Sequence, residues 1–158
     1  MKQRFFRIGV LAVALSFSLA LYACGGPQEA IYTTADAETL LASGAFDESM
    51  APVDGDIVAV LYGIDASTVE ECVSYLATNT SVSADELTIL VLTDGQAAQA
   101  ALEACQARVE SQIAVCESYA PAAVPRLESA VIRQADNTVL LAVGDPEVLP
   151  GAVDALHA

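Results

Sequence analysis

The chain has 158 residues, with six basic against 21 acidic residues and a formal net charge of −15. From Cys24 onward there is no lysine, and three arginines stand against all 21 acids, a net charge of −18. Such charge repels nucleic-acid phosphates, so we exclude nucleic acid as a partner. A hydrophobic fraction of 54% excludes a disordered acidic tail, and the length suits one folded domain.

Residues 1–23 have the features of a bacterial lipoprotein signal peptide. Three basic residues precede an uncharged run over 8–22, which is shorter than the about 20 apolar residues of a membrane-spanning helix. The run ends in LYAC, residues 21–24, which resembles the lipobox, where the cysteine receives a diacylglyceryl group and the signal is cleaved before it. The sequence therefore predicts lipid attachment at Cys24 and a membrane-anchored, extracytoplasmic protein on the cell surface or in the periplasm. The alternative is an ordinary secreted protein.

The segment behind Cys24, residues 24–36, has no regular hydrophobic period and is predicted to be a flexible tether. Fully extended, it reaches at most about 40 Å, which holds an acidic domain clear of an anionic bilayer. Residues 37–158 are predicted to form a single domain.

The first half of this domain contains both clear and ambiguous patterns. Residues 37–45 predict a short helix that Gly44 stops, and residues 86–93 predict a strand rich in β-branched side chains. Residues 55–64 are mostly apolar, a pattern that fits a buried helix or a strand. Residues 67–76 predict a helical turn that leads into a strand, with Ser67 three residues before Glu70 as a possible helix cap.

The second half is dominated by a long helix over residues 97–119, which the prolines at 121 and 125 end. Its apolar stripe is predicted to face the core and comprises Leu102, Cys105, Val109, Ile113 and Cys116, with Glu103, Arg108 and Glu110 on the opposite face. Strands over 129–134 and 138–143 flank a short polar turn, and a last helix is expected over 147–156.

This order of elements predicts an α+β fold, with an antiparallel sheet of about four strands and the long helix and shorter helices packed on one face.

From Leu61 to Asp145 the chain resembles a family of small uncharacterised bacterial lipoproteins that share a C-terminal domain of unknown function. The resemblance rests on the lipobox and on LYGID at 61–65, ADE at 84–86, YAP at 119–121, VPRLE at 124–128 and AVI at 130–132. The chain departs from that pattern in lacking lysines in the long helix and in having three cysteines inside the domain. The resemblance implies the fold and the membrane address, and no activity.

Catalytic and metal-binding patterns are weak. The one histidine, His157, is next to the C-terminus, where chains are usually frayed, so we predict no catalytic base there. Asp54-Gly55-Asp56 has the start of a calcium-binding turn but not the later ligands of an EF-hand loop. We therefore expect no catalytic, cofactor-binding or metal-binding residue, and no cofactor.

Three cysteines remain in the domain, at 72, 105 and 116. Cys105 and Cys116 lie about 16 Å apart along one helix, so they cannot form a disulfide with each other. Either one could pair with Cys72, but core packing of free thiols is the favoured interpretation.

The remaining candidate groups are acidic and aromatic. The pairs Glu70-Glu71 and Asp85-Glu86 are predicted to be solvated surface carboxylates. Tyr62 and Tyr119 are predicted to pack at the ends of elements with their hydroxyl groups reaching water.

Two functional hypotheses follow. The favoured one is a non-enzymatic binding or accessory domain for a protein partner or a small ligand, and the negative charge favours a basic partner and salt-sensitive binding. The alternative is an extracytoplasmic hydrolase or thiol-redox protein that uses its acids or one cysteine.

Overall fold

A five-stranded antiparallel sheet forms the centre of the fold in a computed structural model that describes residues 31–46 and 49–157. The strand order is β1-β2-β3-β5-β4, and the strands are β1 (Met50–Pro52), β2 (Val69–Ala77), β3 (Glu86–Leu92), β4 (Val131–Ala135) and β5 (Thr138–Val143). This confirms the predicted α+β class, with β1 as an additional edge strand. The predicted signal peptide, Cys24 and the tether up to residue 30 lie outside the described residues.

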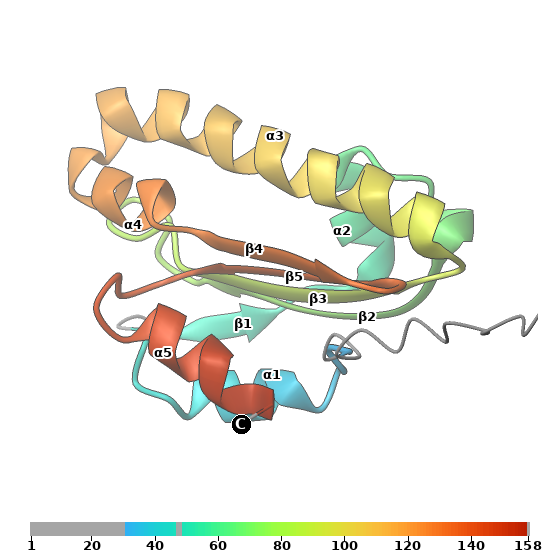
Figure 1. The fold of residues 1–158 in the computed structure, drawn as a ribbon. Coiled ribbons are helices and arrows are strands. Elements are labelled where there is room, and N and C mark those ends of the chain that lie inside the picture. The colour runs from blue at the N-terminus through green and yellow to red at the C-terminus, as the bar shows by residue number, and fades with distance from the viewer. Residues whose placement is uncertain (1–30, 47–48, 158) are drawn as a thin grey trace, which may run out of the picture.

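Helices lie on both faces of the sheet (Figure 1). The long helix α3 (Gly95–Tyr119) shares one face with α2 (Gly55–Tyr62) and α4 (Val124–Glu128). The opposite face, which was expected to be uncovered, carries α1 (Asp36–Leu41) and α5 (Leu149–Asp154). Short 3-10 turns complete the set at Ala66–Thr68, Pro121–Ala123 and Ala155–His157. No helix of the described part is long and apolar enough to cross a membrane.

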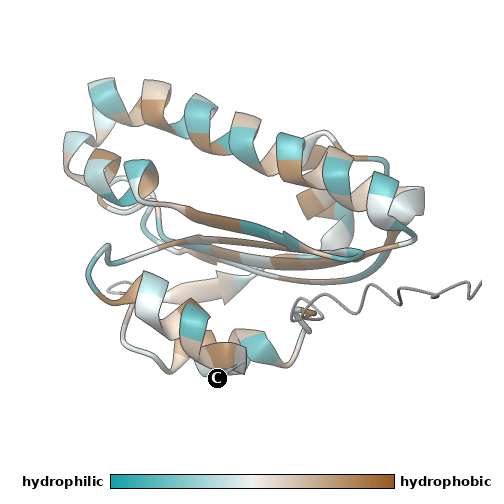
Figure 2. Cartoon of the chain, viewed as in Figure 1, coloured by the Kyte–Doolittle hydropathy of each residue, from teal (hydrophilic) through white to brown (hydrophobic). Residues whose placement is uncertain are grey.

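Two hydrophobic cores result from this three-layer arrangement. Along β3, Leu90 and Leu92 pack under α3, whereas Leu87 and Ile89 pack against the layer of α1 and α5. Because successive side chains of a strand point to opposite faces, a central strand covered on both sides is apolar at nearly every position. Figure 2 shows hydrophobic residues along the central strands and mixed polarity along α3.

The ambiguous segment at residues 55–64 forms helix α2. Its last residue is followed by Gly63, whose positive φ of 69° provides the left-handed C-cap. Val58, Ala59 and Tyr62 are buried on one side of the helix. The pattern alone did not distinguish helix from strand because residues on the opposite side of α2 are apolar as well.

The other sequence-based elements are largely confirmed. Residues 66–68 form the expected turn before β2, although its N-terminus is capped by Asp65, whose Oδ1 accepts a 2.9 Å hydrogen bond from Ser67 N. The helix α3 buries its predicted stripe, and β4 and β5 form the predicted hairpin. Tyr32, inside the segment predicted as tether, is buried beside α1, and its amide donates to Thr138 Oγ1 at 3.2 Å.

Candidate functional site

A buried polar network lies between the sheet and α3. Its centre is Glu86, the first residue of β3, which is 1% exposed. Arg108 Nε of α3 donates to Glu86 Oε1 at 2.7 Å, and Gln112 Nε2 one turn later donates to Oε2 at 3.0 Å. The Tyr62 hydroxyl at the end of α2 donates a short hydrogen bond to Oε1. One carboxylate therefore joins β3, α2 and α3.

Two hydroxyl groups extend this network across the sheet. The Tyr62 hydroxyl lies 2.7 Å from Thr88 Oγ1, which is itself 2.7 Å from Ser74 Oγ on the paired position of β2. All three residues are buried. We call Tyr62, Ser74, Glu86, Thr88, Arg108 and Gln112 the buried network. Within the described residues, no buried side-chain nitrogen or oxygen lacks a hydrogen-bond partner.

A second buried ion pair adjoins the first. Arg126 of α4 donates from Nη1 to Asp85 Oδ1 at 2.8 Å, and the Asp85 side chain is completely inaccessible to solvent. The prediction that Asp85 and Glu86 are solvated carboxylates was therefore wrong, and so was the placement of Arg108 on the solvent face of its helix. Burial of a carboxylate is favourable only with a cation and hydrogen-bond donors, and two of the domain's three arginines supply them.

The surroundings of Tyr62 and Arg108 raise the pKa values of both groups. Burial raises the pKa of Tyr62 well above its usual value of 10, and the neighbouring Glu86 carboxylate raises it further. For Arg108, burial lowers the pKa, but the hydrogen bond and charge of Glu86 outweigh this and raise it overall. The guanidinium also lies 5.0 Å from the centre of the Tyr62 ring, in cation–π contact. This network holds α2 and α3 on the sheet, and its closed hydrogen bonding leaves Glu86 without the access that a catalytic carboxylate needs.

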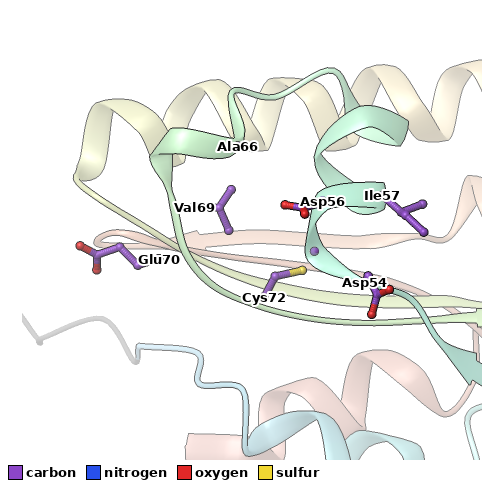
Figure 3. A pocket seen from close by; sticks show the side chains of 8 residues that line it. Asp54, Asp56, Ile57, Ala66, Val69, Glu70 and Cys72 are labelled. Carbon is purple, nitrogen blue, oxygen red and sulfur yellow. The ribbon is translucent and has the colours of Figure 1, made fainter.

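An open cleft of about 560 Å³ lies between α2 and β2 (Figure 3). Its lining combines three carboxylates with apolar side chains and one thiol: Asp54, Gly55, Asp56, Ile57, Ala66, Val69, Glu70 and Cys72. Gly55 lets the start of α2 approach β2 closely, because a Cβ there would lie only 3.3 Å from Cys72 Cβ. The cleft is acidic, because three of its lining residues are carboxylates and none is basic.

The apolar side of α2 beside this cleft faces solvent. Ile57, Val60 and Leu61 are 51%, 82% and 43% exposed, and their spacing of three and four residues places them on one helical face. We call these three residues the α2 face. The sequence showed the apolar run but did not indicate that part of it lies outside the core.

The structure also places the residues that were considered for metal binding and for thiol chemistry. Asp54 and Asp56 lie at the cleft, but no three His, Cys, Asp or Glu side chains in residues 31–46 and 49–157 are arranged to hold a metal ion. Cys72 and Cys105 are free thiols, as is the third cysteine of the domain. Burial raises the pKa of Cys72 to about 11; for Cys105, burial and then Glu86 raise it to about 12. Both are therefore protonated at neutral pH, unlike reactive thiols.

The two tyrosines discussed above behave differently. The prediction that both pack with their hydroxyl groups in water was wrong: Tyr119 is 84% exposed at the end of α3, whereas the hydroxyl of Tyr62 is buried in the network.

A second hollow of about 300 Å³ lies near the C-terminal half of α3 and has only uncharged lining residues. The α2 cleft thus remains the candidate functional site.

Comparison with known families matches residues 42–144 to the profile of a domain of unknown function, DUF4358. The chain belongs to this family. The match confirms the domain part of the resemblance seen in the sequence, which covered residues 61–145. No curated protein and no solved structure matches the chain. The DUF4358 assignment therefore gives the domain a family without indicating a function.

A signal for part of the buried network and for the adjoining Asp85–Arg126 pair was present in the sequence. Tyr62, Asp85, Glu86 and Arg126 all fall in the short segments that carried the family resemblance. In addition, a domain with three arginines and 21 acids has few cations available for its buried carboxylates. Together these features identify the arginines and the Asp85-Glu86 pair as partners worth testing before the structure is known.

Proposed function

We propose that this DUF4358 protein is a membrane-anchored extracytoplasmic lipoprotein, attached through lipid on Cys24, whose domain binds a basic protein partner without catalysing a reaction. The lipobox-like sequence at residues 21–24 supports the anchor. A diacylglyceryl group supplies two acyl chains, and each buried CH₂ contributes about 0.8 kcal/mol to membrane attachment.

The pairing of every arginine in the domain carries the proposal of a basic partner. Arg108 and Arg126 pair with buried carboxylates, and Arg133 Nη2 pairs with Asp154 at 2.6 Å. Since residues 24–158 contain no lysine, the surface offers carboxylates with little compensating positive charge. Such a surface steers and binds cationic partners, and repels anionic ones.

The alternative, a hydrolase or thiol-redox protein, has less support. A thiol-redox protein needs a thiolate near neutral pH, and the raised pKa values of Cys72 and Cys105 oppose this. A hydrolase of the two-carboxylate type needs accessible acids, and Glu86 is enclosed by its partners.

Affinity purification of the tagged, full-length protein from its own membranes in mild detergent tests the proposal. We expect a stoichiometric basic protein that dissociates as salt rises from about 0.1 to about 1 M, because the screening length falls from about 10 to about 3 Å. We expect Cys24→Ser to move the protein to the soluble fraction. Retention of this variant on membranes would refute the lipid anchor, and recovery of the protein alone would refute the partner.

A further inference from the structure

Three of the large apolar side chains exposed on the described surface lie together on α2. These are the residues of the α2 face, Ile57, Val60 and Leu61. Single exposed apolar residues are ordinary, but a contiguous set on one helix bounded by charged residues is typical of an interaction site. Ile57 also lines the acidic cleft, so the apolar face and the cleft form one continuous surface.

The helix cannot turn this face into the core. Its other side is occupied by Val58, Ala59 and Tyr62, all buried, and the Tyr62 hydroxyl is bonded to Glu86 and lies 2.7 Å from Thr88 Oγ1. Its first turn lies against Cys72 through Gly55. The α2 face is thus fixed in an outward orientation, so little conformational entropy of this surface is lost when a partner binds.

Charge decides which occupant this surface fits. The carboxylates of Asp54, Asp56 and Glu70, which we call the acidic rim, line the cleft beside the apolar residues. In Figure 3 Asp56 extends from the first turn of α2 toward Val69 across the cleft, whereas Ile57 extends away from Cys72, so the apolar face begins at the edge of the acidic cleft. A second copy of the chain would bring two acidic rims together, and an anionic bilayer would repel them.

We propose that the α2 face and the acidic rim dock an amphipathic segment of a protein partner, with apolar side chains against α2 and Lys or Arg side chains at the rim. This inference rests on the proposed function and names the surface through which the basic partner binds. Apolar contact supplies the affinity, whereas the carboxylates select for positive charge.

Site-specific photo-crosslinking in the native membrane tests this surface. Val60 of the full-length, lipidated protein is replaced by p-benzoylphenylalanine, with the same replacement at Val115 of α3 as the matched control, since that residue is 56% exposed. We expect a crosslink from position 60 alone, to a partner segment whose sequence is amphipathic and net basic. Crosslinks of equal yield from both positions, none from position 60, a self-crosslink, or a neutral or acidic segment would each overturn the proposal.

A defined peptide then measures the chemistry of the surface. The probe is a synthetic helix-forming peptide of leucine and lysine at amphipathic spacing, titrated against the full-length protein in mild detergent, with the same residues scrambled as the control. We expect Val60→Asn and Asp56→Asn each to weaken binding roughly five-fold to ten-fold, in line with losing one apolar or one ionic contact. Val115→Asn and Glu117→Gln, exposed on α3, should leave the affinity within two-fold. Equal losses of affinity for the α2 variants and the α3 variants would show unspecific attraction and refute the site. Equal binding of the scrambled peptide would do the same.

The two proposals fail in different ways. If a salt-sensitive basic partner is recovered from membranes but Val60→Asn and Asp56→Asn do not reduce its recovery, the proposed function stands and the α2 site is refuted. If no such partner is recovered, the proposed function fails, and with it the inference that depends on it.

Discussion

Replacing Arg108 with methionine tests the role of the buried network most directly. The substitution keeps a long side chain on α3 but leaves the Glu86 carboxylate, whose side chain is 2% exposed, without its cation. Removing one partner of a buried ion pair costs about 3–5 kcal/mol. Because Tyr62 and Gln112 still donate to the carboxylate, we expect the lower end, about 3 kcal/mol.

Urea denaturation followed by circular dichroism measures this loss. With a slope of about 2 kcal/mol per M, a loss of about 3 kcal/mol lowers the midpoint by about 1.5 M. Adding Glu86→Gln to Arg108→Met removes the unpaired charge and keeps a hydrogen-bonding group, so the double variant should recover about half of the loss. The matched control is Arg133→Met, since Arg133 and Asp154 are 40% and 63% exposed and such a pair contributes less than about 1 kcal/mol.

Two results would refute this reasoning. A loss below about 1 kcal/mol for Arg108→Met would mean that the Glu86 carboxylate does not depend on the arginine for its burial. A double variant that is no more stable than Arg108→Met would mean that the cost comes from lost packing of the arginine stem and not from an uncompensated charge.

Three further predictions concern thiols, pH and backbone packing. The free energy of unfolding should stay constant up to about pH 9 and decrease at higher pH. Burial and Glu86 raise the pKa of Cys105 to about 12 and that of Tyr62 well above 10. Both groups therefore lose their protons on unfolding at high pH, which favours the unfolded state. Urea titrations from about pH 7 to about pH 11 check this, and Cys105→Ser should flatten the fall. At neutral pH, Cys105 should not react with maleimide in the folded protein. All three domain thiols should react after denaturation, and fewer than three reactive thiols would indicate a disulfide. Gly144→Ala should cost about 1–3 kcal/mol in urea denaturation, since its Cβ would lie 2.6 Å from the Ala45 carbonyl oxygen, whereas Gly151→Ala meets nothing within 4 Å and should not destabilise.

The sequence predicted well those elements whose hydrophobic period fits a helix or a strand but not both. The apolar stripe from Leu102 to Cys116 repeats at helical spacing for about four turns. The runs over 129–134 and 138–143 flank a short turn, so local pattern and tertiary burial agree in both places. The helix α2 is different, since eight mostly apolar residues fit either element and the packing of Tyr62 decides. The edge strand β1 has three residues and ends in Pro52, too short to have a period.

The candidate site was less predictable than the fold, because it depends on which side chains deviate from average behaviour. Adjacent acids are usually solvated, yet Asp85 and Glu86 are both buried with an arginine each. The apolar residues of α2 show the opposite deviation, since Val60 is 82% exposed within a run that resembles a core segment. Both outcomes depend on long-range placement, which hydrophobic period does not contain and which the scarcity of arginines only hints at.

The strong negative charge of the surface is not a requirement of this fold. The two buried carboxylates are compensated by Arg108 and Arg126, and the packing described for both cores contains no position that needs a further acid. Lysines on the exposed side of α3 would reduce the net charge of −18 and the self-repulsion that it causes. Some surface acids make local contacts, such as the caps by Asp65 and Asp94, but the net excess of negative charge opposes stability, and we attribute it to the proposed basic partner. In our proposal, this partner meets the acidic rim and the outward-facing apolar residues of α2, which combine charge selection with apolar contact.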